Sequence, residues 1–86
     1  MIGIQASQIR EDMMILIANY CALKVENIYS EMKLRDDLGL DSFGAVELIY
    51  ETEMKFKIGI TNTDLKNIIT VSDIIDLVIN RIESKQ

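Results

Sequence analysis

The sequence predicts an all-α fold: a small bundle of three main helices plus one short helix, with a long first loop. Apolar residues recur at helical spacing along most of the chain. No segment alternates apolar and polar residues over the length of a strand, since Ile58 and Ile60 give a single alternation. The 86 residues, 49% apolar and 27% charged, suit a single folded domain spanning residues 1–86.

The first helix is expected near the N-terminus. Its apolar face follows the spacing i, i+4, i+7, i+8 and i+11 and consists of Ile9, Met13, Leu16, Ile17 and Tyr20. Ser7 precedes this face as an expected N-cap, and Glu11 and Asp12 lie in the first turns, where acidic side chains suit the helix dipole. Cys21 lies on the apolar side of the same helix, so we expect it in the core.

A long connection from Leu23 to Leu40 separates the first helix from the second. It is too long for a structureless loop, so we expect its apolar residues to hold it against the core: Val25, Ile28, Tyr29, Met32, Leu34 and Leu38. The second helix is expected to begin at Asp41, a favourable N-cap, and to end near Lys55. Its apolar stripe consists of Phe43, Val46, Ile49 and Tyr50, widened by Ala45 and Leu48.

Two further helical segments follow. Asn62 or Thr63 can cap a short helical turn over residues 65–68. Thr70 and Asp73 have the spacing of a capping box, which predicts the start of a last helix with the apolar positions Val71, Ile74, Ile75, Val78 and Ile82. The residues expected to meet inside the bundle are Met13, Leu16, Ile17, Val46, Ile49, Ile75 and Val78.

Negative charge is concentrated in the middle of the chain. Residues 36–53 contain six acidic residues and no basic one, so they carry a formal charge of −6, whereas the remaining residues sum to +1 (nine basic against eight acidic). The acidic side chains of this acidic segment are Asp36, Asp37, Asp41, Glu47, Glu51 and Glu53. They form either a solvated face or a field that steers a basic partner toward the start of the second helix.

The composition excludes several classes of chemistry. The chain contains no His, which excludes Ser-His-Asp triads and HExxH zinc sites. A single Cys excludes an internal disulfide and suits a reducing compartment. The net charge of −5 argues against nucleic acid or anionic lipid as partners. The longest apolar run is six residues (13–18) and no signal peptide is visible, so we expect a cytoplasmic monomer with no membrane insertion.

Two motifs near Ser42 fail on closer reading. Residues 36–47 begin and end with an acid as an EF-hand loop does, but the third and fifth positions are leucines and the sixth is Asp41 instead of Gly, so no metal site is expected. A nucleophile elbow, GxSxG, would need Gly at position 40 and a His base. Position 40 is Leu, and the chain has no His.

The segment LRDDLGLDSFGAVELIYETEMKF, residues 34–56, resembles the acyl carrier protein family. The family is marked by a D-S-L triplet at the start of the second helix, preceded by an acid-Leu-Gly stretch, and here the corresponding residues read DLGLDSF, 37–43. The residues VEL (46–48) and IITV (68–71) also resemble family positions. The likeness extends over about residues 4–82, with the elements in matching order and spacing.

The resemblance implies a function for Ser42 and its neighbours. In this family the Ser of the triplet bears a 4′-phosphopantetheine arm, which a separate phosphopantetheinyl transferase adds from coenzyme A and whose thiol carries acyl groups as thioesters. Ser42 is then the covalent attachment site and Asp41 fixes the helix start beside it. The chain would be a carrier and not an enzyme. The residues expected to meet the basic surfaces of acyl-activating and acyl-transferring enzymes are Asp36, Asp37, Phe43, Val46, Glu47, Tyr50, Glu51 and Glu53.

Three departures from the family pattern leave the cargo open. Phe43 replaces the usual Leu, Gly44 replaces a polar or acidic residue, and Lys55 and Lys57 interrupt an acidic run. The chain could therefore serve fatty-acid biosynthesis, a related specialised pathway, or the transport of aminoacyl or polyketide units. An acidic helical interaction module without a prosthetic group is the remaining alternative.

Overall fold

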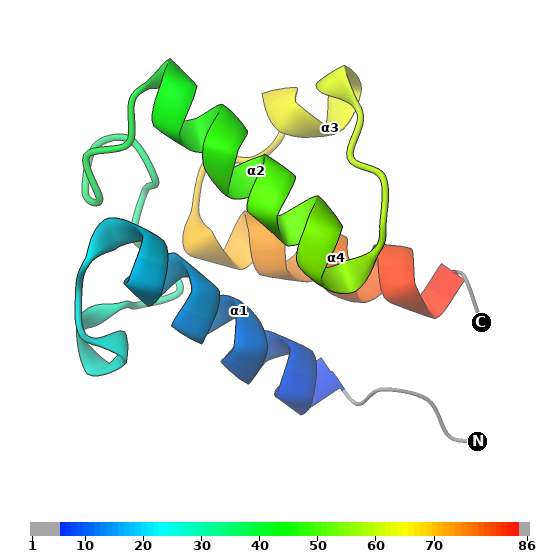
Figure 1. The fold of residues 1–86 in the computed structure, drawn as a ribbon, viewed down its shortest axis with the longest axis horizontal. Coiled ribbons are helices and arrows are strands. Elements are labelled where there is room, and N and C mark those ends of the chain that lie inside the picture. The colour runs from blue at the N-terminus through cyan, green and yellow to red at the C-terminus, as the bar shows by residue number, and fades with distance from the viewer. Residues whose placement is uncertain (1–5, 85–86) are drawn as a thin grey trace.

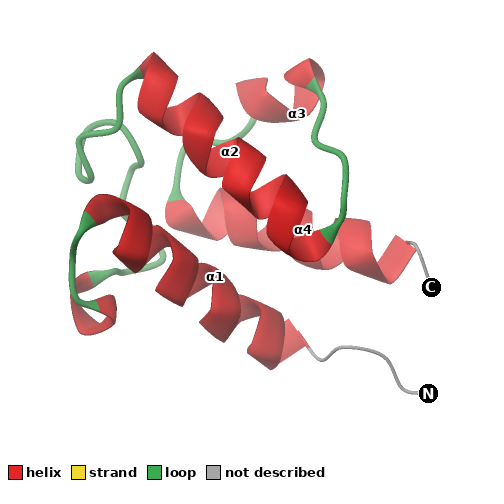
Figure 2. Ribbon diagram, in the orientation of Figure 1, coloured by secondary structure: helices red, strands yellow, loops and turns green. Residues whose placement is uncertain are grey.

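The computed structural model describes residues 6–84, which fold into helices joined by loops (Figure 1). The elements in chain order are α1 (Ala6–Cys21), the 3₁₀ turn η1 (Val25–Asn27), α2 (Ser42–Phe56), α3 (Asn62–Lys66) and α4 (Val71–Ser84). Figure 2 shows helices and connecting loops, with no strand in the described range. The predicted all-α bundle, with three main helices, one short helix and a long first loop, is confirmed.

The core lies where α1, α2 and α4 meet. α4 contributes most to it because its apolar residues are confined to one face, as its sequence predicts. The side chains with almost no exposed surface are Ile9, Met13, Ile17, Leu48, Thr52, Val71, Ile74, Ile75 and Val78. Of the expected core, Met13, Ile17, Ile49, Ile75 and Val78 are buried, and Leu16 is half-buried against the cluster.

The buried face of α2 differs from the predicted stripe. It consists of Gly44, Leu48, Ile49 and Thr52, whereas Val46 is 58% exposed, so the expectation that Val46 lies in the core is wrong. Apolar side chains occur on several sides of this helix, and periodicity alone does not select the side that packs. The Thr52 hydroxyl donates to the Leu48 carbonyl oxygen at 2.8 Å, which satisfies the buried polar group.

The first loop is held to the core by some of its apolar residues. Ile28 and Leu34 are buried, whereas Val25 and Tyr29 are exposed and do not anchor it. Backbone contacts add to this attachment. Lys33 and Thr70 form an isolated antiparallel bridge, and the N–H groups of residues 34, 71 and 72 each bond across to the facing segment at 2.9 Å. The first loop is therefore joined to the segment that enters α4.

Side-chain caps fix three helix starts. The Asp41 carboxylate accepts a hydrogen bond from the Gly44 N–H, as expected. Thr70 and Asp73 exchange hydrogen bonds across the first turn of α4, so the predicted capping box is confirmed. A second capping box pairs Thr61 with Asp64, so the cap of α3 lies one residue before Asn62 and two before Thr63, and the helix spans Asn62–Lys66 instead of the expected residues 65–68.

Two smaller boundary predictions also change. α1 begins at Ala6, so Ser7 lies inside the helix and the prediction that it is the N-cap is wrong. α2 ends at Phe56, and Lys57 follows in the left-handed conformation, with φ 57°, as its C-cap.

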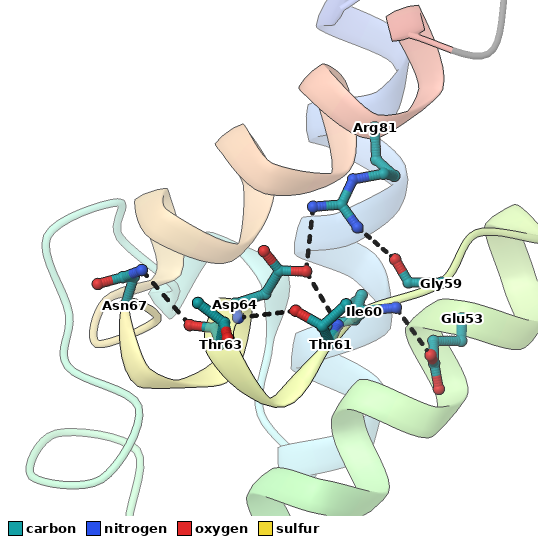
Figure 3. A network of polar contacts seen from close by, with 8 residues as sticks. All are labelled: Glu53, Gly59, Ile60, Thr61, Thr63, Asp64, Asn67 and Arg81. Atoms are coloured by element: carbon teal, nitrogen blue, oxygen red, sulfur yellow. Dashed lines mark hydrogen bonds and ion pairs between the residues drawn. The ribbon is translucent and has the colours of Figure 1, made fainter.

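A polar network joins α4 to the connection between α2 and α3 (Figure 3). The Arg81 guanidinium donates to the Gly59 carbonyl at 2.5 Å and to the Asp64 carboxylate at 3.0 Å. The Glu53 carboxylate accepts from the Ile60 N–H at 2.9 Å. Asp64 therefore both caps α3 and pairs with α4, and these hydrogen bonds, the one from the Thr61 backbone foremost, lower its pKa.

Cys21 ends α1 half-buried and packed against the core, where burial raises the pKa of its thiol. Among residues 6–84, no helix combines the length and apolar character needed to cross a bilayer.

Candidate functional site

Ser42 is the first residue of α2 and is exposed. Its position follows from Asp41, whose extended backbone (φ −86°, ψ −175°) and 2.7 Å side-chain bond to the Gly44 N–H fix where the helix begins. The Ser42 hydroxyl consequently stands at the N-terminal end of α2, where unpaired N–H groups favour negatively charged groups.

Gly44 allows this helix start to approach its surroundings closely. A Cβ at position 44 would lie 3.3 Å from Asp41 Oδ1 and 3.3 Å from Leu40 Cδ2. Gly44 is buried, so a side chain there would press on both the N-cap and the core. The departure from the family pattern at position 44 thus has a local packing reason.

The turn before α2 brings Arg35 to Ser42. The Asp37 carboxylate accepts from the Lys33 N–H at 2.8 Å, and Gly39, with φ 74°, closes the turn in a conformation that favours glycine. Leu34 anchors the turn in the core. The Arg35 guanidinium, which is exposed, donates a hydrogen bond to Ser42 Oγ.

An apolar cavity of about 440 Å³ opens beside Ser42. Its walls come from the first loop, α2, α3 and the residues after α3, and include Leu34, Ala45, Leu48, Ile49, Leu65 and Ile68. Ser42 and Arg35 also line it, and because both are exposed they lie where it meets solvent. This volume is within the range of pockets that hold small ligands, about 300–1,000 Å³.

An exposed apolar stripe extends along α2 from Ser42. Phe43, Val46 and Tyr50 are 70%, 58% and 59% exposed, and Met54, which the sequence reading missed, continues the stripe at 61%. Exposed aromatic and Met side chains on one helix face are typical of surfaces that bind proteins. The role of Phe43, Val46 and Tyr50 in partner recognition stays a prediction.

The acidic side chains expected to meet partners fall into two groups. Four accept hydrogen bonds from other residues of the chain. Asp37, Asp41 and Glu53 accept them from backbone N–H groups, and Glu47 accepts one from the Tyr20 hydroxyl at 2.5 Å. Asp36 and Glu51 are exposed and have no hydrogen bond or ion pair within residues 6–84. These two carboxylates therefore keep all of their acceptor sites open to a partner, whereas the other four have one already in use.

The bond to Glu47 changes the acidity of Tyr20. The hydrogen bond from its hydroxyl to Glu47, helped by burial and nearby negative charge, raises the pKa of Tyr20 to about 12. Tyr20 and Arg35 both contact predicted site residues, but the sequence reading assigned neither to the site. Arg35 was visible as the basic residue immediately before the acidic segment, while the contact of Tyr20 depends on how α1 packs on α2.

Residues 13–78 match the family model described as "Phosphopantetheine attachment site". The acyl carrier protein of Aster yellows witches'-broom phytoplasma is 42% identical over 60 residues, covering 70% of this chain and 79% of that protein.

Solved structures show the same fold. The acyl carrier protein of Thermotoga maritima aligns with a TM-score of 0.77 at 22% identity, covering 94% of each chain. A doublet acyl carrier protein from prodigiosin biosynthesis aligns with a TM-score of 0.73 at 21% identity. That match covers 87% of this chain and 36% of the doublet's length.

Proposed function

The chain belongs to the acyl carrier protein family with its phosphopantetheine attachment domain, and we propose that it holds acyl intermediates as thioesters on an arm attached to Ser42. The observation that carries the proposal is the position of the Ser42 hydroxyl, exposed at the start of α2 and at the mouth of an apolar cavity. The family domain carries a covalent 4′-phosphopantetheine, whose thiol supplies the thioester chemistry. Proteins of this family are carriers, so the reactions belong to partner enzymes.

The residues around Ser42 fit a phosphate-bearing group. The Arg35 guanidinium already donates to Ser42 Oγ, and the helix start offers N–H groups to an anion. None of these groups can take the hydroxyl proton, because a guanidinium only donates and the chain has no His. In line with its family, we assign the modification of Ser42 to a separate transferase.

We assign the cavity to the acyl tail. Most of its lining is aliphatic, and each methylene that leaves water contributes at most about 0.8 kcal/mol. An apolar tail of several carbons thus gains stability there, whereas a short polar cargo does not. This favours an acyl cargo, for fatty-acid biosynthesis or a related specialised pathway, over the aminoacyl or polyketide alternative.

Intact mass spectrometry tests the attachment. Incubation with coenzyme A and a broad-specificity phosphopantetheinyl transferase should add one phosphopantetheine to the wild-type protein and to Ser30→Ala, which alters an exposed serine of the first loop. Ser42→Ala should gain none. A wild-type protein that stays unmodified by several transferases would leave the interaction module as the better reading.

Thermal unfolding of acylated samples tests the cargo. The midpoint should rise with acyl chain length and then level off as the cavity fills. Ala45→Leu places a larger side chain in the cavity wall, so its unfolding midpoint should level off at a shorter acyl chain than that of the wild type. If no chain length changes the midpoint of the wild-type protein, the tail stays in solvent and an aminoacyl or polyketide cargo becomes the better assignment.

A further inference from the structure

Arg35 is held beside Ser42 by the fold of the turn and not by an ion pair. Leu34 is buried, and the Arg35 carbonyl accepts from the Gly39 N–H at 3.0 Å, so the backbone on both sides is fixed. No carboxylate of residues 6–84 lies within ion-pair distance of the Arg35 guanidinium. Its described polar partner is Ser42 Oγ.

Among the described residues the Arg35 guanidinium has no ion pair, although acidic residues lie next to it and to Ser42 in the chain. Arg35 immediately precedes the acidic segment, with Asp36 beside it in the chain and Asp41 beside Ser42. A negatively charged group attached through Ser42 Oγ would add to the charge of this acidic segment, and Arg35 supplies a positive charge in direct contact with that oxygen. The Arg35 side chain makes no described hydrogen bond that holds the fold together, since its contact is with one exposed hydroxyl.

We propose that Arg35 binds the phosphate of the arm on Ser42 and fixes the direction in which the arm leaves α2, along the mouth of the cavity. This rests on the proposed attachment at Ser42. A phosphodiester formed there has its phosphorus bonded to Oγ, so its free oxygens lie within reach of a guanidinium that already touches Oγ. The planar fork of Arg can donate to two phosphate oxygens at once, which fixes orientation as well as position, whereas Lys provides only a point charge.

The test compares how much the arm stabilises matched variants. Arg35→Gln, Arg35→Lys and Lys24→Gln, an exposed cation outside the cavity, are each prepared with and without phosphopantetheine. Attachment should raise the unfolding midpoint of the wild type and of Lys24→Gln by about 2–4 °C more than that of Arg35→Gln, with Arg35→Lys between them. High salt should reduce this difference, because an exposed ion pair is screened.

A spectroscopic readout covers the case in which Arg35→Gln resists modification. In ¹⁵N-labelled wild-type protein, the guanidinium signals of Arg35 should shift on phosphopantetheine attachment while those of Arg10, in α1, stay in place. An equal midpoint rise in Arg35→Gln and wild type, or unshifted Arg35 signals, would overturn the proposal. Both results require protein already modified at Ser42, so they are distinct from a failure of the attachment itself.

Discussion

The hydrogen bond from Tyr20 to Glu47 joins α1 to α2 about one and a half turns beyond Ser42. This bond engages the Glu47 carboxylate, which the charge pattern of the sequence predicts to meet partner enzymes. The bond also keeps the phenol protonated at high pH, because the ionised form would lose the bond and repel Glu47.

An absorbance titration of the phenolate measures this effect. The difference between wild type and Tyr20→Phe isolates Tyr20, and its midpoint should lie at about 12. In Glu47→Ala the midpoint should fall toward the ordinary value of 10.0, whereas Glu51→Ala, one turn further along α2, should leave it in place. A wild-type midpoint at the ordinary value would contradict the bond.

The same shift sets a direction for stability. The folded protein holds the Tyr20 proton more tightly than the unfolded chain does, so the stabilisation is fully present below pH 10 and is lost as the pH rises toward about 12. Denaturant unfolding across that window should show the wild type losing its advantage over Tyr20→Phe.

At the scale of elements, α3 is short, and the network around Arg81 joins it to α4 (Figure 3). Arg81 is partly exposed, at 32%, so its bonds are partly screened. Arg81→Gln should lower the free energy of unfolding by about 1 kcal/mol, since the substitution removes a charged hydrogen-bond donor from a half-buried pair. Arg10→Gln, which removes an exposed positive charge from α1, is the matched control.

Urea unfolding gives the free energy of these variants, and hydrogen exchange shows where stability is lost. Faster exchange in Arg81→Gln should be concentrated in α3 and the connection before it. If Arg81→Gln and Arg10→Gln changed the free energy of unfolding equally, the network would contribute no more than an ordinary surface charge does.

Some elements of the fold follow from local sequence signals, and others depend on packing that the sequence pattern does not specify. Capping is local, so the Thr70–Asp73 box was predicted from its spacing and the N-cap Asp41 from its residue type. The buried side of α2 was only partly predicted, because apolar residues occur on several sides of that helix and only tertiary packing selects the side that is buried. The contact between Arg35 and Ser42 needs a turn closed by Gly39 at positive φ, which the chain pattern does not specify.

At the scale of the whole molecule, the negative charge around Ser42 should govern how fast partners arrive. Asp36→Lys combined with Glu51→Lys reverses the two acidic-segment carboxylates that have no internal bond. It should slow modification by the transferase several-fold at low ionic strength, since exposed charges act mainly on encounter rate.

The control makes the same change in charge elsewhere. Glu26→Lys combined with Glu83→Lys alters exposed residues of η1 and α4 and should leave the rate closer to that of the wild type. The two double variants should converge at high salt. Equal slowing by both would mean that net charge matters and its place on the surface does not.

The half-buried thiol at the end of α1 has a practical consequence for labelling. The sequence contains one cysteine, and burial raises the pKa of its thiol, so its fraction of reactive thiolate is smaller than that of an exposed thiol. The thiol at the end of a phosphopantetheine arm is not buried in this way, and its pKa is not raised by burial. Fluorophores or cross-linkers that react with thiolates should therefore select the arm over Cys21, and the unaltered protein can be tagged at its cargo position without first removing a cysteine.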